Sequence, residues 1–250
     1  MLTKNDLFIG FRQTGLTAGE VVLVHSSYKS LGPVDGGPQA VVDALLEVIT
    51  PTGTLIIPTF NFNFNKGEPW DVRTTPSHMG VLTEVVRLNP DSRRVFHPFY
   101  SFAILGKLKD ELTRVRYKDS YGPDSIFMQL RKLDAKIMVI GLSYTHSMTF
   151  FHHIEQMEGV DYRFIKKFTG PVTDETGKTY EDTFTMLVRD VDRGVQTEVD
   201  PMGEVLEKRG VVTIHKIGDA DVKIMKANEV YRVTAEEMKK KPGLMYRIEK

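Results

Sequence analysis

Residues 21–60 read VVLVHSSYKSLGPVDGGPQAVVDALLEVITPTGTLIIPTF, and this stretch decides the expected fold. It opens with the apolar run VVLV and closes with TLIIP, and short continuous apolar runs of this kind are typical of buried strands. Between them, apolar residues repeat at i, i+3, i+4 and i+7 from Val42, after a Gly-Pro pair that indicates a helix start. A strand, a helix and a strand in succession predict a βαβ unit with two parallel strands.

The alternation of strands and helices continues to about residue 160. Periodicity and apolar runs predict helices at 79–88, 125–133 and 148–158, and strands at 101–105 and 136–142. Residues 60–77 form a long irregular stretch that carries three phenylalanines and the only tryptophan, Trp70. Because loops of this length are often functional, we interpret the stretch as a wall of a binding site or, alternatively, as a packed structural loop.

After Gly159 the pattern changes to hairpins and helices. The expected hairpins are 162–168 with 179–188 and 211–217 with 222–227; a helix is expected at 200–209, and Thr234 with Glu237 predicts the capping box of a last short helix. We therefore expect one α/β domain over residues 1–250. Its central, largely parallel or mixed sheet with flanking helices belongs to residues 1–160, and a mixed part rich in hairpins belongs to residues 161–250.

Composition narrows the classes of function. The 33 Lys and Arg balance 33 Asp and Glu, which argues against a nucleic-acid partner, since such binding depends on an excess of cations. The absence of cysteine excludes a disulfide framework, a Cys-zinc site, an iron–sulfur cluster and a thiol nucleophile. No apolar run approaches the length of a membrane span or a signal peptide, so a cytoplasmic protein is the default expectation.

The loop between the first strand and the first long helix is one candidate site. A Gly-rich loop that leads into a helix N-terminus offers backbone N–H groups to an anion, and residues 25–37 add the hydroxyls of Ser26, Ser27 and Ser30 and the cation Lys29. The loop lacks both the GK[ST] of a P-loop and the GxGxxG of a dinucleotide site. Phosphate binding and an ordinary turn therefore both remain open on the residues alone.

The pair His152 and Glu155 is the second candidate. On a helix these residues are i, i+3 neighbours, and a carboxylate beside an imidazole fixes its tautomer and raises its basicity, as a general base requires. A surface ion pair is the alternative. A metal site built from His146, His152, His153 and Glu155 is a rival interpretation, although the sequence contains no HxxxH spacing and no cysteine.

Two further positions stand next to predicted strands. Thr59 follows Pro58 at the end of a buried strand, where ligands bind in open α/β sheets, and a structural hydroxyl is the alternative. His97 precedes Pro98, which restricts His97 to an extended backbone beside aromatic residues. It could face a ligand or simply pack at the entry to the next strand.

These pieces, in this order, resemble the aminoglycoside 3-N-acetyltransferase family, also called the antibiotic N-acetyltransferases. The segments that carry the resemblance are VHSSYKSLGPVDGGPQAVVDALLEVITPTGTLIIPTF (24–60), HMGVLTEVVR (78–87), FHPFYSFAILG (96–106), YGPDSIFMQLRKLDAKIMVIGL (121–142) and MTFFHHIEQMEGVDYR (148–163). The resemblance covers about residues 20–165 and continues weakly beyond them.

The resemblance implies acetyl-CoA as donor, an amine of an amino sugar as acceptor, and direct transfer without a metal. By position, the catalytic residues would be His152, Glu155 and Thr59. The residues implied for CoA are His25, Ser26, Ser27, Lys29, Ser30, Leu31, Gly32, His97 and Ser101.

The sequence departs from the family before the implied catalytic histidine, where it reads SYTHSMTFFHH. A polycationic acceptor also favours an acidic pocket, which a net charge of zero does not supply globally. A nucleotide amino sugar or a cell-surface sugar is therefore the alternative acceptor, and a non-catalytic relative that binds CoA or a sugar is the alternative class. A homodimer is left open as the assembly.

Overall fold

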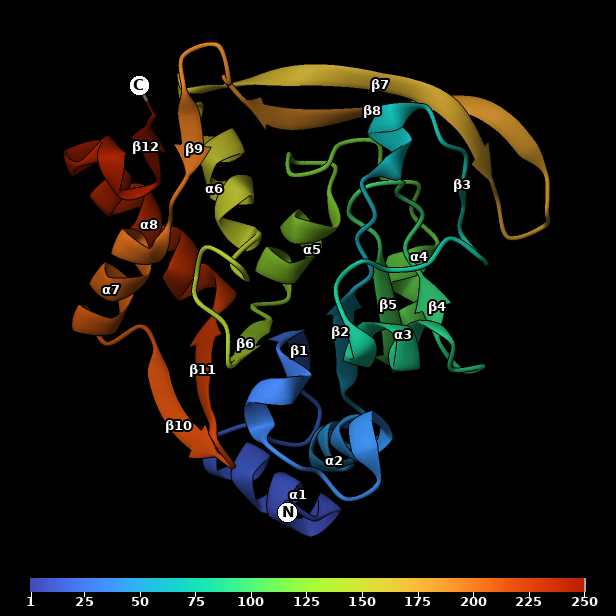
Figure 1. Cartoon of the computed structure of the whole chain (residues 1–250), viewed down its shortest axis with the longest axis vertical. Helices are drawn as coiled ribbons and strands as arrows, with labels where there is room; N and C mark the ends of the chain where they lie inside the picture. Colours follow the sequence, from blue (N-terminus) through green and yellow to red (C-terminus); the bar gives the residue numbers. More distant parts are fainter. Residues whose placement is uncertain (250) are drawn as a thin grey trace.

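The computed structural model describes residues 1–249 and contains a seven-stranded mixed sheet at its centre. In spatial order the strands are β10 (Thr213–Ile217), β11 (Ala220–Lys226), β6 (Lys136–Ile140), β1 (Val21–Ser26), β2 (Thr54–Pro58), β5 (Phe102–Gly106) and β4 (Arg93–Arg94). The C-terminal hairpin β10–β11 thus extends the same sheet that the first half of the chain begins. Figure 1 shows this arrangement.

The predicted βαβ unit is present, and its strands are parallel. Val22 of β1 lies opposite Leu55 of β2, and β1 is also parallel to β6 on its other side. The strands at both flanks, β5 and β11, run antiparallel to their neighbours. The expectation of an α/β fold with a largely parallel or mixed sheet is therefore confirmed, with mixed as the correct term.

Helices cover both faces of the sheet because alternate strand residues point to opposite faces. Val22 and Val24 pack in one apolar cluster with α1 (Lys4–Gln13), α2 (Gly37–Ile49) and α3 (Val81–Arg87). Leu23 packs in the other cluster with α5 (Ile126–Lys132), α6 (Phe150–Glu158), α7 (Asp200–Lys208) and α8 (Ala227–Lys240). The result is a three-layer core, helices on sheet on helices.

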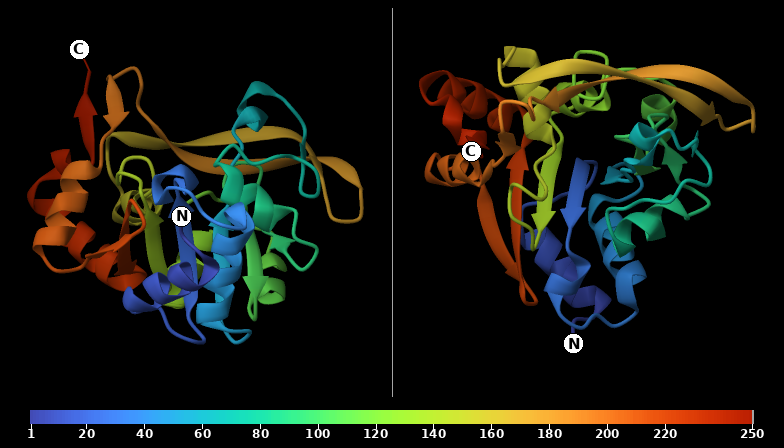
Figure 2. Two further views of the ribbon diagram at one scale, coloured as in Figure 1. Left: turned by 60° about the horizontal axis from the view of Figure 1, so that its bottom comes forward. Right: turned by 45° about the horizontal axis from the view of Figure 1, so that its top comes forward.

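A long hairpin arches over the carboxyl edge of the sheet (Figure 2). Its strands β7 (Arg163–Thr173) and β8 (Thr179–Arg189) confirm the predicted first hairpin and are longer than expected. The short strand β3 (Trp70–Asp71) pairs with β7, and β9 (Val195–Thr197) pairs with β12 (Tyr246–Ile248). Helix α4 (Lys109–Thr113) lies beside β4 (Figure 1).

The irregular stretch 60–77 is mostly a packed structural loop. Phe60, Phe64 and Trp70 are buried, and Trp70 meets Phe96 edge-on at 5.2 Å between ring centroids. These side chains pack beneath the hairpin, which supplies an apolar surface that sequence spacing does not reveal. Phe64 and Trp70 also line a cavity of about 250 Å³, so the interpretation as a wall of a binding site stays a prediction.

The expectation of a separate short helix beginning at Thr234 is wrong. Helix α8 begins at Ala227, where Asp134 accepts the backbone N–H of Asn228 at 3.0 Å, and Thr234 lies buried in its interior. The apolar positions Val230 and Val233 anchor the helix on the core, so packing outweighs the local capping pattern. None of the helices formed by residues 1–249 is long and apolar enough to cross a membrane.

Candidate active site

The carboxylate of Glu155 is the centre of the candidate site. Its Oε2 lies 2.6 Å from Nδ1 of His152 and 2.9 Å from Nε of Arg163, and its Oε1 accepts the Tyr162 hydroxyl at 2.8 Å. Glu155 is fully buried, whereas the His152 side chain is 16% exposed. The i, i+3 spacing on α6 thus brings histidine and carboxylate together as expected, with only the imidazole open to solvent.

The end of α6 explains why the chain returns to this carboxylate. Phe150, Phe151 and Ile154 anchor the helix in the core. Gly159 ends it in the left-handed conformation at φ 69°, so that the following residues turn back along the helix. Tyr162 and Arg163 arrive beside Glu155 as a consequence of this turn.

The protonation states of Glu155 and His152 follow from their burial and from the charged groups beside them. Burial by itself raises the pKa of Glu155, but His152, Arg163 and the Tyr162 hydroxyl outweigh it and hold the pKa below its ordinary value. Burial, with Arg163, lowers the pKa of His152 more than Glu155 raises it. Burial and Arg163 therefore reverse the expected rise in the basicity of His152, and its imidazole is neutral at pH 7. Its Nδ1–H donates to the carboxylate, which leaves Nε2 as the free ring acceptor.

A pocket of about 310 Å³ opens beside His152. Its walls come from α6, from the segments before β5 and α5, and from β7, β8 and β9 with the turn between the last two. The residues that line it are Tyr100, Tyr121, His152, Arg163, Met186, Leu187, Val188, Arg189, Val191 and Thr197. Tyr121 contacts the imidazole at 5.2 Å between ring centroids, and none of the described residues in the lining is acidic.

The loop after β1 lies at the carboxyl edge of the sheet and packs tightly against the segment after β6. Ser30 donates to the carbonyl of Ser27 at 2.6 Å, within a 3₁₀ turn at Tyr28–Leu31. A Cβ on Gly141 would lie 1.8 Å from Oγ of Ser30, so only glycine fits there. Asp219 of the β10–β11 turn faces Gly32 from the other side, within 2.5 Å of where a Cβ would stand.

The remaining residues of this loop differ in exposure. His25 is buried in β1, its Nε2 has no hydrogen-bond partner among residues 1–249, and burial lowers its pKa to about 4. Ser26 ends the strand and is half-buried, Leu31 is buried, and Lys29 is exposed. The loop therefore presents polar groups and the cation Lys29 at the edge where ligands bind in such sheets, with the exposed carboxylate of Asp35 further along the same loop.

Thr59 and Ser101 form a second buried cluster with Arg94. The two hydroxyl oxygens are 2.9 Å apart, and Nε of Arg94 donates to both, at 3.2 Å to Thr59 and 3.1 Å to Ser101. All three side chains are buried, and Thr59 is absent from the lining of the His152 pocket. The structure thus brings Thr59 and Ser101 together at the edge of the sheet, but in a group separate from Glu155.

The side chain of His97 is hydrogen-bonded to the backbone of the turn just after it, at Phe99 and Tyr100. Its Nδ1 accepts the backbone N–H groups of Phe99 at 3.2 Å and Tyr100 at 3.0 Å. Burial, with a contribution from Lys118, lowers the pKa of His97 to about 3, so the ring is neutral. His97 thus holds the backbone at Tyr100, and Tyr100 lines the pocket beside His152, whereas His97 itself is absent from that lining.

The other histidines are engaged elsewhere. His153 donates from Nδ1 to the carbonyl of Tyr121 at 2.5 Å, and His146 is exposed and bonded to Ser143 at 2.8 Å. Within residues 1–249, no group of three or more His, Cys, Asp or Glu side chains lies close enough to hold a metal ion.

Sequence reasoning missed Arg163, Tyr162, Tyr121 and Arg189. Their roles depend on the return of the chain after α6 and on the arch of the hairpin, neither of which has a local signal. The segment EGVDYR at 158–163 contains two of them, and the glycine before them was the available indication of a sharp turn.

An α/β fold with a mixed sheet thus places a buried carboxylate behind a partly exposed histidine, an arrangement suited to proton transfer. The family model described as aminoglycoside 3-N-acetyltransferase matches residues 23–239, and the chain belongs to this family of acyltransferases. One relative is the SPbeta prophage-derived aminoglycoside N(3')-acetyltransferase-like protein YokD of Bacillus subtilis. It is 26% identical to this chain, and the match covers 91% of this chain and 89% of the length of the relative.

Solved structures share the fold. The crystal structure of aminoglycoside acetyltransferase AAC(3)-Xa has a TM-score of 0.85 and 24% identity, over 96% of this chain and 93% of its own. The structure described as AAC-IIIb binary with CoASH has a TM-score of 0.83 and 20% identity, over 95% and 96% of the two chains.

Proposed function

We propose that the protein transfers the acetyl group of acetyl-CoA to an amine of an aminoglycoside or a related amino sugar, with His152 as general base. The observation that carries this proposal is the hydrogen bond of 2.6 Å between His152 and the buried Glu155. It leaves Nε2 of a neutral imidazole beside a pocket. Membership of the family supports the reaction class, and the structural relative bound to CoASH supports the donor.

In this mechanism the base is needed because an ammonium has no lone pair with which to attack a thioester. Nε2 of His152 takes the proton, directly or through a water molecule, and Glu155 stabilises the imidazolium that forms. The amine nitrogen then bonds to the acetyl carbon. When the tetrahedral intermediate collapses, the C–S bond breaks and the imidazolium returns its proton to the departing CoA thiolate. The nitrogen loses its second proton to Nε2 of His152, which is then neutral again, and from there to solvent, so that a neutral amide is released. Backbone N–H groups near the strand ends are the donors proposed for the oxyanion.

The donor in this proposal lies along the carboxyl edge of the sheet. The loop after β1 offers the hydroxyls of Ser26, Ser27 and Ser30, and Lys29 offers an exposed cation for a phosphate. Thr59 and Ser101 stand at the ends of the neighbouring strands β2 and β5. Direct transfer is consistent with a chain that has no cysteine for an acyl-enzyme.

One observation favours a second acceptor class, a nucleotide amino sugar. The pocket beside His152 is lined by Arg163 and Arg189 and by no acidic residue of the described chain. Arginines repel a polycationic acceptor, whereas they attract the phosphates of a sugar nucleotide. Glu155 is paired with Arg163 at 2.9 Å and balances its charge, so Arg189 is the cation that the lining adds toward a ligand.

The experiment that tests the proposal is thiol release from acetyl-CoA with the variant His152→Ala. We expect loss of acetyl transfer with retained CoA binding, and His146→Ala, which removes an exposed histidine from the segment before α6, is the matched control. Full activity of His152→Ala would show that the base is wrongly assigned. An acceptor panel of aminoglycosides and nucleotide amino sugars separates the two acceptor classes, and no thiol release with any acceptor would favour a non-catalytic relative.

A further inference from the structure

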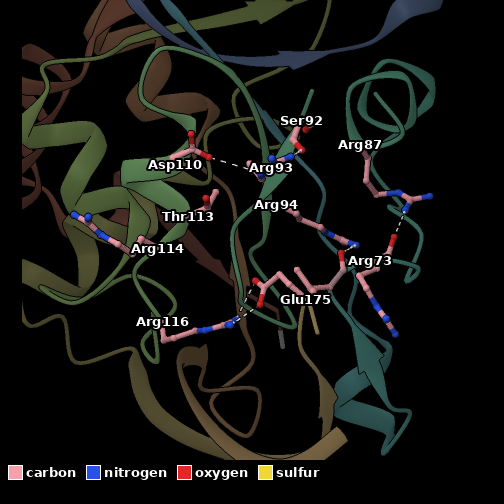
Figure 3. Close-up of a pocket in the computed structure, with 11 residues that line it drawn as sticks. Arg73, Arg87, Ser92, Arg93, Arg94, Asp110, Thr113, Arg114, Arg116 and Glu175 are labelled. Atoms are coloured by element: carbon pink, nitrogen blue, oxygen red, sulfur yellow. Dashed lines mark hydrogen bonds and ion pairs between the residues drawn. The ribbon is translucent and has the colours of Figure 1, made fainter. Parts of the chain in front are cut away.

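A second pocket, of about 440 Å³, is lined by six arginines and lies apart from His152 and Glu155. We name it the arginine pocket. Its arginines come from separate segments, the loop after β3, α3, β4 and the residues after α4, and Figure 3 shows them as sticks. The lining residues that carry a charge are Arg73, Arg87, Arg93, Arg94, Arg114, Arg116, Asp110 and Glu175. In a chain of zero net charge, this is a strong local excess of cations.

Arg94 forms the buried part of this pocket. Its residue is 9% exposed, and no carboxylate among residues 1–249 lies within 4 Å of its guanidinium. It donates instead to neutral oxygens, including the carbonyls of Thr59 at 2.9 Å and Thr75 at 2.5 Å. A buried cation without a counter-ion is costly, and burial lowers the pKa of Arg94 to about 9. The fold thus fixes a buried positive charge that has no carboxylate in direct contact.

The other arginines are held by carboxylates to different degrees. Arg73 is paired with Asp71, and Arg87 is paired with Glu84. The charges of these two arginines are thus neutralised by carboxylates that do not line the pocket. The pair of Arg93 with Asp110 is long, at 3.6 Å, and both side chains are more than half exposed. Such exposed pairs contribute little to stability and open readily.

Glu175 is an internal anion within the arginine pocket. It stands in the turn between β7 and β8, and its carboxylate pairs with Arg116, as the dashed lines of Figure 3 show. The Glu175 side chain is 49% exposed and that of Arg116 is 41% exposed, so the contact is solvated and easily displaced. A carboxylate on an exposed turn therefore occupies a position that a stronger anion can take.

We propose that the arginine pocket binds a phosphate group of a small ligand, in place of the Glu175 carboxylate. A phosphate dianion matches the site because the planar guanidinium of Arg116 can bind two of its oxygens at once. Arg94, whose nitrogens already donate to protein oxygens, adds a fixed positive charge to the same pocket. The phosphate belongs either to CoA itself or to a separate phosphorylated ligand. This assignment is independent of the reaction proposed for His152.

The test is calorimetric titration of the full chain with inorganic pyrophosphate. We expect one saturable site in the wild type, with affinity about tenfold weaker in Arg116→Gln and several-fold stronger in Glu175→Gln, since the second variant removes the competing carboxylate. Arg12→Gln and Glu181→Gln alter exposed charges on α1 and β8 and serve as matched controls that leave the affinity unchanged.

The source of the phosphate is decided by a second titration, with CoA and with 3′-dephospho-CoA. If pyrophosphate competes with CoA and Arg116→Gln weakens CoA but not 3′-dephospho-CoA, the ligand is the 3′-phosphate of CoA. If pyrophosphate and CoA bind together, the ligand is a separate phosphorylated molecule. Absence of saturable pyrophosphate binding, or equal affinity in wild type, Arg116→Gln and Glu175→Gln, would overturn the proposal.

Discussion

Replacement of Glu155 by glutamine separates charge from shape at the centre of the site. Glutamine keeps the length of the side chain and its carbonyl oxygen can still accept the Tyr162 hydroxyl, but the charge that faces His152 and Arg163 is lost. Arg163 is 4% exposed, so it remains as a buried cation without its carboxylate. Breaking a buried ion pair in this way costs about 3 to 5 kcal/mol.

This cost sets the expected loss of thermal stability in Glu155→Gln. For a domain of about this size, each kcal/mol lowers Tm by about 2 to 4 °C, so Tm should fall by about 6 to 20 °C. The variant also lowers the pKa of His152 further, because burial and Arg163 lower that pKa and Glu155 is the group that raises it. A positioned general base contributes about 10²- to 10⁴-fold to rate, and we expect kcat to fall at least about 100-fold while CoA affinity is retained.

The assays are calorimetric unfolding, CoA titration and thiol release from acetyl-CoA, each against the control Tyr162→Phe. This control removes one hydrogen bond to the same carboxylate without a change of charge, so it should cost about 1 kcal/mol and leave most of the activity. A Glu155→Gln protein with the Tm and kcat of the wild type would refute the reasoning. It would show that the negative charge of Glu155 supports neither Arg163 nor His152.

Two further predictions concern backbone space and pH. Gly141→Ala should cost roughly 1 to 3 kcal/mol in urea unfolding, because its φ is 63° and the new methyl would stand 1.8 Å from Oγ of Ser30; unchanged stability would show that the loop after β1 adapts freely. Burial lowers the pKa of His25 and His153 to about 4 and that of His97 to about 3. Below the ordinary histidine pKa of 6.5, these three side chains bind protons in the unfolded chain but stay neutral in the folded one. Their contribution to the free energy of unfolding is therefore fully present above pH 6.5 and is lost as the pH falls toward 4. The slope should approach about 4 kcal/mol per pH unit, and urea unfolding at pH 7 and pH 5 measures it; equal stability at the two values would contradict the buried, neutral state.

Local patterns were sufficient where a feature depends on neighbours in sequence. The apolar runs and the i, i+3, i+4 repeat from Val42 determine β1, α2 and β2, because burial of these residues favours one period only. The spacing of His152 and Glu155 likewise determines their contact, since residues three apart on a helix lie on one face. The same kind of reasoning failed at Thr234, where apolar packing of α8 outweighs a local capping pattern.

The sequence by itself determined the βαβ start of the sheet, the hairpins, the pairing of histidine with carboxylate, and, by resemblance, the family. Only the tertiary structure decided that Arg163 shares the carboxylate of Glu155, that Thr59 joins Arg94 rather than His152, and that arginines from separate segments meet in one pocket. The physical reason is range. Helix and strand periods are set within a few residues, whereas the burial and charge that fix a pKa or a binding preference come from residues brought together by the folded chain.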